Sequence, residues 1–219
     1  MRLRRGVMTG QGIEKQSWKP GNVLAPLPVV LVSCGGASWK PNIITIAWTG
    51  SVCSDPPMLS ISVRPERYSY RIIHACGEFV VNLPSRRLAK LTDWCGMVSG
   101  QQVDKFAESG LTPAAAQSVQ CPIILECPVN IECRVSKVMA LGSHTMFVAE
   151  VLAVQVSSGL IDEKGKFRLD RANLLAYGLG HYYTLGSQID HFGFSIRKRK
   201  PKTAAKGRKR QRCSPTAKK

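Results

Sequence analysis

The chain has 219 residues, of which 44% are hydrophobic, so it is long enough for one domain with a full core. Its formal net charge of +17 would suit a nucleic-acid binder, but twelve of the basic residues, and no acidic ones, lie in 197–219. No apolar run approaches the ~20 residues of a membrane helix, and the first residues lack the apolar stretch of a signal peptide. We therefore expect a cytoplasmic protein.

The charge distribution predicts three parts: an N-terminal extension (1–19), a domain (20–196) and a basic tail (197–219). The domain is nearly neutral, with fourteen basic and thirteen acidic residues. The tail has too few large apolar residues to form a core, so we predict that it is disordered. A solvated tail that aids solubility is the favoured interpretation. Electrostatic binding of nucleic acid or an anionic membrane is the alternative.

Short β-rich segments separated by turn residues dominate the first part of the domain. Predicted strands run over 27–34, 43–53, 58–63 and 78–83. The sequence Ser54-Asp-Pro-Pro57 predicts a chain reversal between the second and third of these strands.

Two helices are predicted between and after these strands. The first covers 65–76, since Pro65 suits the first helical position and Gly77 suits the residue after the last turn. The second starts with Ser85 as its N-cap and continues to Cys95-Gly96.

The second half reads as a loop with a short helix around 103–106, followed by strands over 123–126, 129–140 and 144–156. The last of these alternates regularly, which is typical of a long antiparallel strand. There are many short strands, few helices and no regular βα alternation, so the order favours a barrel over a doubly wound sheet.

Eight cysteines occur without any CxxC pair, which argues against a zinc or iron–sulfur site and predicts no metal. In a cytoplasmic protein they are expected to be thiols rather than disulfides. Cys121, Cys127 and Cys133 follow one another at intervals of six, too far apart along a strand to share one ion. We interpret them as small buried hydrophobic residues.

Familiar nucleotide and hydrolase motifs are absent from the sequence. There is no GxGxxG, no GxxxxGK[ST] and no GxSxG, so a Rossmann site, a P-loop and a nucleophile elbow are not indicated. Any nucleotide-like ligand must be held in another way.

The segment PNIITIAWTG (41–50) is the best candidate for a binding wall. On a strand, Asn42 and Trp48 share one face and Thr45 and Ala47 the other, so neither face is uniformly polar. Such a pattern suits a barrel wall covered by a ligand or partner. An ordinary strand with two structural threonines is the alternative.

Seven blocks in consistent order carry a resemblance to a known family: PVVLVS, NIITIAW, SDPPMLSISVRPERYSYRII, GEFVVNLPS, SGQQVDKF, PIILECPVNIECRV and HTMFVAEV. Over about 20–195 the chain resembles the flavin reductase-like, FMN-binding split-barrel family, and most closely its flavoredoxin-type branch. The resemblance implies a mainly β fold, a six-stranded antiparallel split barrel of Greek-key type with a few peripheral helices. It also implies a homodimer with FMN near the dimer interface.

The resemblance further implies which residues bind the cofactor. Around the isoalloxazine ring it points to Asn42, Thr45, Ala47, Trp48, Ser51 and Cys53. Around the phosphate it points to Arg67, Tyr68, Ser69, Ser99 and Lys105, and a helix N-terminus with basic residues is physically suited to an anion. His144 is implied near the ring, where a donor or partial positive charge stabilises reduced FMN, and Tyr177 beside the ring or ribityl chain.

Three functions remain open on the sequence alone. The first is a flavoprotein whose FMN accepts hydride from NAD(P)H, or electrons from a redox protein, and passes them on; no catalytic acid or base is assigned. The second is a non-enzymatic FMN electron carrier between proteins. The third is a nucleic-acid-associated protein that acts through the basic tail.

Overall fold

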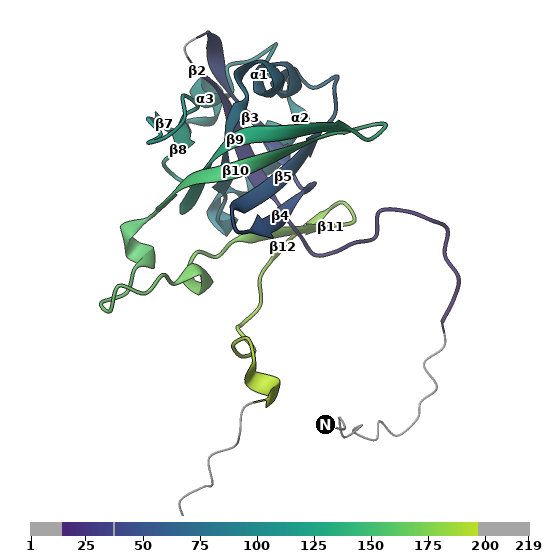
Figure 1. The fold of residues 1–219 in the computed structure, drawn as a ribbon, viewed down its shortest axis with the longest axis vertical. Helices are drawn as coiled ribbons and strands as arrows, with labels where there is room; N and C mark the ends of the chain where they lie inside the picture. The colour runs from purple at the N-terminus through teal and green to yellow at the C-terminus, as the bar shows by residue number, and fades with distance from the viewer. Residues whose placement is uncertain (1–14, 37, 197–219) are drawn as a thin grey trace, which may run out of the picture. The chain divides into compact units, whose positions relative to one another are not determined.

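The computed structural model describes residues 15–36 and 38–196, so the predictions for the basic tail and for most of the N-terminal extension fall outside it. A seven-stranded antiparallel sheet forms the body of the fold (Figure 1). Its strands are β2 (Val30–Gly36), β3 (Trp39–Ile46), β4 (Thr49–Ser54), β5 (Pro57–Val63), β6 (Glu78–Leu83), β9 (Val129–Ala140) and β10 (Thr145–Val156). Their order in the sheet is β3-β2-β6-β9-β10-β5-β4.

The two strands at the ends of this order are consecutive in the chain. Only Ala47 and Trp48 separate β3 from β4, and the amide of Ser62 in β5 donates to the carbonyl of Trp48 at 2.8 Å. The sheet therefore curls until its ends meet at this junction, which we call the seam. The single strand predicted over 43–53 is wrong in this detail, because the chain bends at the seam. If β3 and β4 are counted as one bent strand, the curled sheet has the six strands expected of the split barrel.

The interior of the curled sheet is filled by alternating side chains from its strands. Val32, Ile61, Phe79 and Phe147 are completely buried there. The reversal predicted at Ser54-Asp-Pro-Pro57 is confirmed, because β4 and β5 pair in antiparallel register up to Ser54 and Pro57.

Helix α1 (Tyr68–Cys76) packs Ile72 and Ile73 into the same core. It begins three residues later than predicted, because the residues after Pro65 form a turn in which the amide of Arg67 donates to Arg64 O at 3.0 Å. Its predicted end is confirmed: Gly77 has a φ of 67°, and its amide donates to Ile73 O.

Helices α2 (Ala89–Met97) and α3 (Lys105–Ser109) cover the outer face of β2 and β3. Leu31 and Ile43 of the sheet pack there with Cys95 and Phe106 of the helices. A short 3₁₀ turn, η1 (Arg86–Leu88), precedes α2 and has Ser85 as its N-cap, so the predicted helix starts with this turn. The short helix expected around 103–106 is α3.

The remaining strands form two small sheets. One has the order β1-β11-β12 and contains β1 (Leu27–Pro28), β11 (Leu175–Gly178) and β12 (His181–Thr184). The other pairs β7 (Pro113–Ala114) with β8 (Ile123–Ile124). The strand predicted over 123–126 thus ends two residues early. The strand predicted over 129–140 is confirmed as β9, and β10 begins one residue after the predicted start.

Two further 3₁₀ turns, η2 (Ser158–Leu160) and η3 (Leu169–Arg171), lie between β10 and β11. The described residues up to Gly186 belong to one compact unit, and the described part of the second unit contains the turn η4 (Phe194–Ile196). Among the described residues, no helix has both the length and the apolar character needed to cross a membrane.

The three cysteines at intervals of six are buried, as predicted. They lie on different elements: Cys121 before β8, Cys127 after it and Cys133 within β9. Burial raises the pKa of Cys121 and of Cys133 to about 12, so both remain protonated thiols near neutral pH.

Candidate functional site

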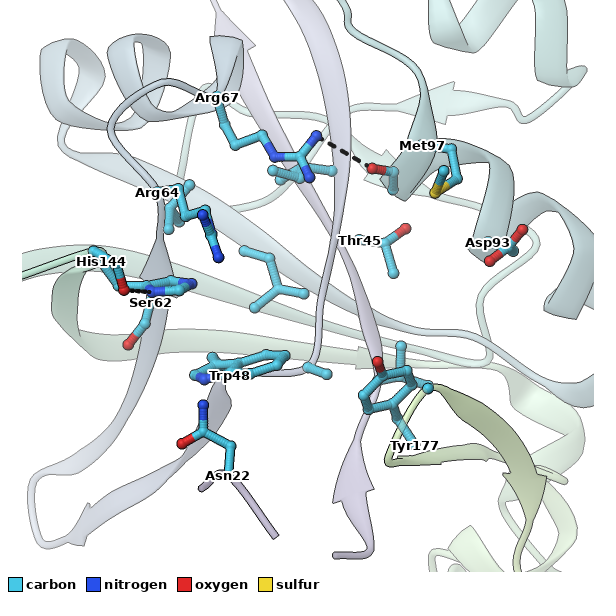
Figure 2. A pocket seen from close by; sticks show the side chains of 18 of the residues that line it. Asn22, Thr45, Trp48, Ser62, Arg64, Arg67, Asp93, Met97, His144 and Tyr177 are labelled. Carbon is cyan, nitrogen blue, oxygen red and sulfur yellow. Dashed lines mark hydrogen bonds between the residues drawn. The ribbon is translucent and has the colours of Figure 1, made fainter. Parts of the chain in front are cut away.

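A cavity of about 430 Å³ opens at the seam, where β3 passes into β4. We call it the central cavity. Its walls also include the end of β5, the last turn of α2 and residues of β11 and β12. In Figure 2, Arg64 and Arg67 reach into this cavity from one side, while Trp48 and Tyr177 lie on the opposite side. One end of the cavity is therefore cationic and the other aromatic.

A second cavity of about 360 Å³ continues from the cationic end of the first. We call it the cationic cavity. The two share Ile44, Arg64, Arg67 and Gly96, so they form one continuous groove. The cationic cavity also includes residues from α1, from the loop after α2 and from α3, among them Tyr68, Ser69, Ser99, Gly100 and Lys105. One acidic residue, Glu66, lines it as well and pairs with Arg64 at 3.4 Å, so the three cations outnumber it.

The first turn of α1 faces the cationic cavity. Arg67 is the N-cap residue, and Tyr68 and Ser69 are the first two helical residues. The first amides of a helix have no intrahelical acceptor and carry a partial positive charge, so this end favours an anion. No acidic residue occupies the first turn. Arg67 is held in place by a hydrogen bond from Nη1 to Gly96 O at 3.4 Å (Figure 2).

Lys105 supplies a buried cation to the same cavity. It is 3% exposed, and its Nζ donates to Ile43 O and to Cys95 O, both at 2.7 Å. These two bonds leave one of the three ammonium protons for another acceptor. Burial lowers the pKa of Lys105 to about 8. An anion in the cationic cavity would oppose this shift, because it stabilises the charged amine.

Three rings line the aromatic end of the groove. The indole of Trp48 stacks on the imidazole of His144, with ring centroids 5.8 Å apart and 10° between the planes. The ring of Tyr177 lies 6.5 Å from Trp48 at an angle of 49°. Trp48 remains 41% exposed, which is unusual for a residue with so large an apolar surface. A flat ligand would have aromatic surface to pack against here.

The surroundings of His144 favour its neutral form over the cation. Burial lowers its pKa, and the neighbouring charge of Arg64 lowers it further, although Glu66 acts in the opposite direction. Its Nδ1 lies 2.9 Å from the hydroxyl of Ser143. Of the two roles expected for His144, a donor or a partial positive charge, the structure favours the donor.

Comparison with known proteins identifies the fold family. A model of the flavin reductase like domain matches residues 24–186. The chain belongs to this family. Its structure resembles the flavoredoxin of Desulfovibrio vulgaris (Miyazaki F), with a TM-score of 0.78 and 30% identity over 84% of this chain and 100% of that one. The flavoredoxin of Methanosarcina acetivorans gives a TM-score of 0.75 and 28% identity over the same shares.

The chain also has a curated relative that is similar in sequence. An uncharacterized protein of Archaeoglobus fulgidus is 36% identical over 141 residues, which are 64% of this chain and 78% of the relative.

The groove of this flavin reductase-like chain brings together most of the residues expected at the site. Those that line it are Thr45, Ala47, Trp48, Arg67, Tyr68, Ser69, Ser99, Lys105, His144 and Tyr177. Ser51 instead lines a third cavity, which shares Trp48 with the central cavity. Cys53 lies on the exposed strand β4, outside all three cavities, where its thiol donates to Asp55 O at 3.4 Å.

Asn42 lies beneath the groove rather than in its lining. Its side-chain amide donates to Ser69 Oγ at 2.8 Å, and the residue is 3% exposed. Gly100 packs directly against it, since a Cβ on Gly100 would lie 2.0 Å from Asn42 Oδ1. The geometry gives Asn42 a positioning role, because it links β3 to the first turn of α1 and to the loop after α2.

Sequence reasoning missed the polar pair formed by Asp93 and Tyr182. Both line the central cavity, and the hydroxyl of Tyr182 donates to Asp93 Oδ1 at 3.1 Å. Burial and the adjacent carboxylate raise the pKa of Tyr182 to about 12. These residues are 89 positions apart, and no local pattern marks either of them. Sequence reasoning also missed Ser62, although a polar residue that alternates with the apolar residues of β5 could have indicated it.

Proposed function

We propose that this chain is an FMN-binding flavoprotein of the flavin reductase or flavoredoxin type, which takes electrons from a donor and passes them on. The observation that carries the proposal is the continuous groove, aromatic at one end and cationic at the other. FMN has the same two-part character: a flat ring system with a polar edge, and a terminal phosphate. The flavoredoxin relatives support the same assignment.

The residues present fit this cofactor. Trp48, His144 and Tyr177 would face the ring system, and the seam backbone beside Ala47 would offer donors and acceptors to its polar edge. Arg67, Lys105 and the first amides of α1 would hold the phosphate. Bound FMN would supply two-electron redox chemistry, while the protein binds it, orients it and limits its contact with water.

A binding titration tests this proposal. Purified protein is expected to bind FMN with a change in the flavin absorbance and quenching of its fluorescence, and to bind riboflavin more weakly because riboflavin lacks the phosphate. A protein that binds neither ligand would falsify the proposal. Equal affinity for FMN and riboflavin would still support binding of the ring system at the aromatic end. It would contradict binding of the phosphate in the cationic cavity.

The electron donor is either NAD(P)H or a redox protein. Anaerobic mixing of the FMN-loaded protein with NADH and with NADPH separates the two cases. Loss of the visible absorbance of the oxidised flavin would show hydride transfer from the nicotinamide. If neither nucleotide bleaches the flavin but a reduced redox protein does, the chain is an electron carrier.

A homodimer, a cytoplasmic location and any role of the basic tail belong to the same proposal. Exposed apolar side chains on the β9–β10 hairpin support self-association, since Val138, Met139 and Leu141 are each more than 40% exposed. Sedimentation of the purified protein tests whether it self-associates. Retention on nucleic acid at low salt, compared with a variant lacking 197–219, tests the tail.

A further inference from the structure

A fourth cavity, of about 720 Å³, is separate from the groove. None of the described residues that line it also lines the central cavity, the cationic cavity or the cavity beside Ser51. Its walls come from η1, η2, the end of η3 and the segment between β8 and β9. We call it the arginine cavity, because Arg86, Arg87 and Arg171 line it. Its volume lies within the ~300–1,000 Å³ typical of small-molecule sites.

The three arginines of this cavity are exposed and have no side-chain partner within the described residues. Four other arginines there do form a side-chain hydrogen bond or ion pair: Arg64, Arg67, Arg134 and Arg168. Apart from the three in the cavity, Arg71 is the one described arginine without such a partner. Most of the unpaired guanidinium groups in the described part of the chain are therefore gathered around one cavity.

Glu126 is the one acidic residue among the described residues that line the arginine cavity. Both of its carboxylate oxygens accept from the amide of Thr112 at 3.1 Å, and it forms no ion pair with the arginines. The guanidinium groups thus exceed its charge by two. Such an excess attracts an anion, and a guanidinium is shaped to donate to two oxygens of a phosphate or carboxylate.

Backbone hydrogen bonds hold the arginine-bearing segments side by side. The amide of Arg86 in η1 donates to Asn173 O at 2.7 Å, and the amide of Leu175 donates to Pro84 O at 3.3 Å. These bonds tie the start of η1 to the segment that directly follows Arg171. The three charges are therefore placed around the cavity by the fold before any ligand arrives, which reduces the cost of binding.

The base of the arginine cavity is apolar. Leu88, Leu160 and Ala172 line it and are 9%, 6% and 5% exposed. Leu160 and Ala172 belong to one buried cluster with Val129, so they form part of a packed surface. A ligand that fits both features has an anionic group for the arginines and an apolar body to cover this base.

We propose that the arginine cavity binds small phosphomonoesters that carry an apolar body, at a site separate from the groove. A phosphomonoester has about 1.5 to 2 negative charges near pH 7 and three strong acceptor oxygens, which match the excess charge and the guanidinium donors. A neutral ring compound would leave the cations without a counter-charge. Inorganic phosphate would leave the apolar base uncovered. The site does not depend on the proposed function.

The test uses phenyl phosphate as the probe, with inorganic phosphate and benzyl alcohol as comparisons for its charge and its ring. Binding to the purified full-length protein is measured by calorimetry at about pH 7.5, without FMN and with saturating FMN. FMN fills the groove under the proposed function, so the binding that remains reports on the arginine cavity. We expect phenyl phosphate to bind about tenfold more tightly than inorganic phosphate, because its ring is buried, and benzyl alcohol to bind most weakly.

Single substitutions locate the binding. Arg87→Gln and Arg171→Gln are each expected to weaken phenyl phosphate binding about threefold to fivefold, the worth of an exposed ion pair. Arg71→Gln is the matched control, because Arg71 is also exposed and unpaired within the described residues but does not line the cavity. Thermal unfolding should be unchanged in all three variants, since none of these side chains has a described partner to lose.

FMN affinity, measured by absorbance, separates this site from the proposed function. Arg87→Gln should bind FMN as the wild type does, because Arg87 lies outside the groove. A protein that binds phenyl phosphate through Arg87 and Arg171 but does not bind FMN would contradict only the proposed function.

Four outcomes would overturn the inference. The first is no binding of phenyl phosphate. The second is equal affinity for phenyl phosphate and inorganic phosphate, which would show that charge alone attracts the anion. The third is equal weakening by Arg71→Gln and Arg87→Gln. The fourth is loss of binding in Lys105→Ala with none in Arg87→Gln, which would place phenyl phosphate in the groove.

Discussion

The amine of Lys105 joins β3 to α2 by donating to Ile43 O and Cys95 O, each at 2.7 Å, while the same residue lines the cationic cavity. One side chain therefore holds two elements together and presents charge to the groove. A substitution at Lys105 should affect both stability and ligand binding, and the two effects can be measured apart.

Lys105→Ala is expected to reduce FMN affinity tenfold or more and riboflavin affinity much less, because only FMN carries the phosphate. The variant also leaves two carbonyls without their donor, which costs about 1–3 kcal/mol for each buried group. Thermal unfolding measures the second effect. An equal loss of affinity for both ligands would show that Lys105 acts only as a link between β3 and α2.

The pH dependence of binding follows from the lowered pKa of Lys105. Since this pKa is about 8 in the folded protein, the charged amine is lost as the pH rises through 8. The ratio of FMN affinity to riboflavin affinity should therefore fall between about pH 7 and 9.5, because a phosphate with a second pKa near 6 is already ionised there. Lys105→Met should show a flat ratio. A wild-type ratio that does not change over this range would contradict the role assigned to the amine.

The lowered pKa of Lys105 also affects stability, and here the effect of rising pH is opposite to its effect on FMN binding. The ordinary pKa of a lysine side chain is 10.5, so between about pH 8 and 10.5 the unfolded chain binds more protons at Lys105 than the folded one does. The free energy of unfolding contributed by this group therefore rises with pH over that window. Urea titrations of the ligand-free protein at about pH 7.5 and about pH 9.5, compared with Lys105→Met, isolate this contribution.

Gly100→Ala tests the support beneath the groove. The added Cβ would lie 2.0 Å from Asn42 Oδ1, so Asn42 must move and its bond to Ser69 must change. We expect a loss of about 1–3 kcal/mol in stability, as for overpacked sites, together with weaker FMN binding. Gly159→Ala is the matched control, because a Cβ there meets no atom within 4 Å. If the two variants behave alike, Asn42 does not position the phosphate end.

Trp48→Ala should weaken FMN and riboflavin binding to a similar extent, because both ligands have the ring system. An aromatic pair adds about 0.5–1.5 kcal/mol, so the expected loss is about twofold to twelvefold. Trp48→Phe should recover most of it. Loss of FMN affinity alone, with riboflavin unaffected, would place the ring system elsewhere in the groove.

The sequence was sufficient for most strands of the large sheet and for most of the groove, but not for β7, β11 and β12, and the strand predicted over 27–34 is divided between β1 and β2 of different sheets. Alternation along β9 and β10 and the proline-rich reversal after β4 are local signals, and the structure contains these elements as expected. The family resemblance supplied the residues from Trp48 to Tyr177 that share no local pattern. The bend at Ala47 and Trp48 could not be predicted, because it follows from closure of the sheet and not from the propensity of these residues.

The roles of Asn42 and of the Asp93–Tyr182 pair could not be predicted from the sequence either. Asn42 is polar and follows a proline, which gives no sign that its amide would support Ser69, 27 residues away. The contact between Asp93 and Tyr182 depends on how the β1-β11-β12 sheet lies against α2. Such contacts are set by tertiary packing, which neither periodicity nor turn chemistry reports.

The position of the site at the seam has a consequence for heat resistance. The hydrogen bond from Ser62 to Trp48 continues the β4–β5 pairing into the seam, and both residues line the central cavity. A ligand that rests on these residues would bind only the closed form of the sheet. Saturation at about 100 times the dissociation constant adds about 2.7 kcal/mol to the free energy of unfolding. The ligand-free protein should therefore begin to unfold at the seam, and a bound ligand should raise the temperature at which this unfolding occurs.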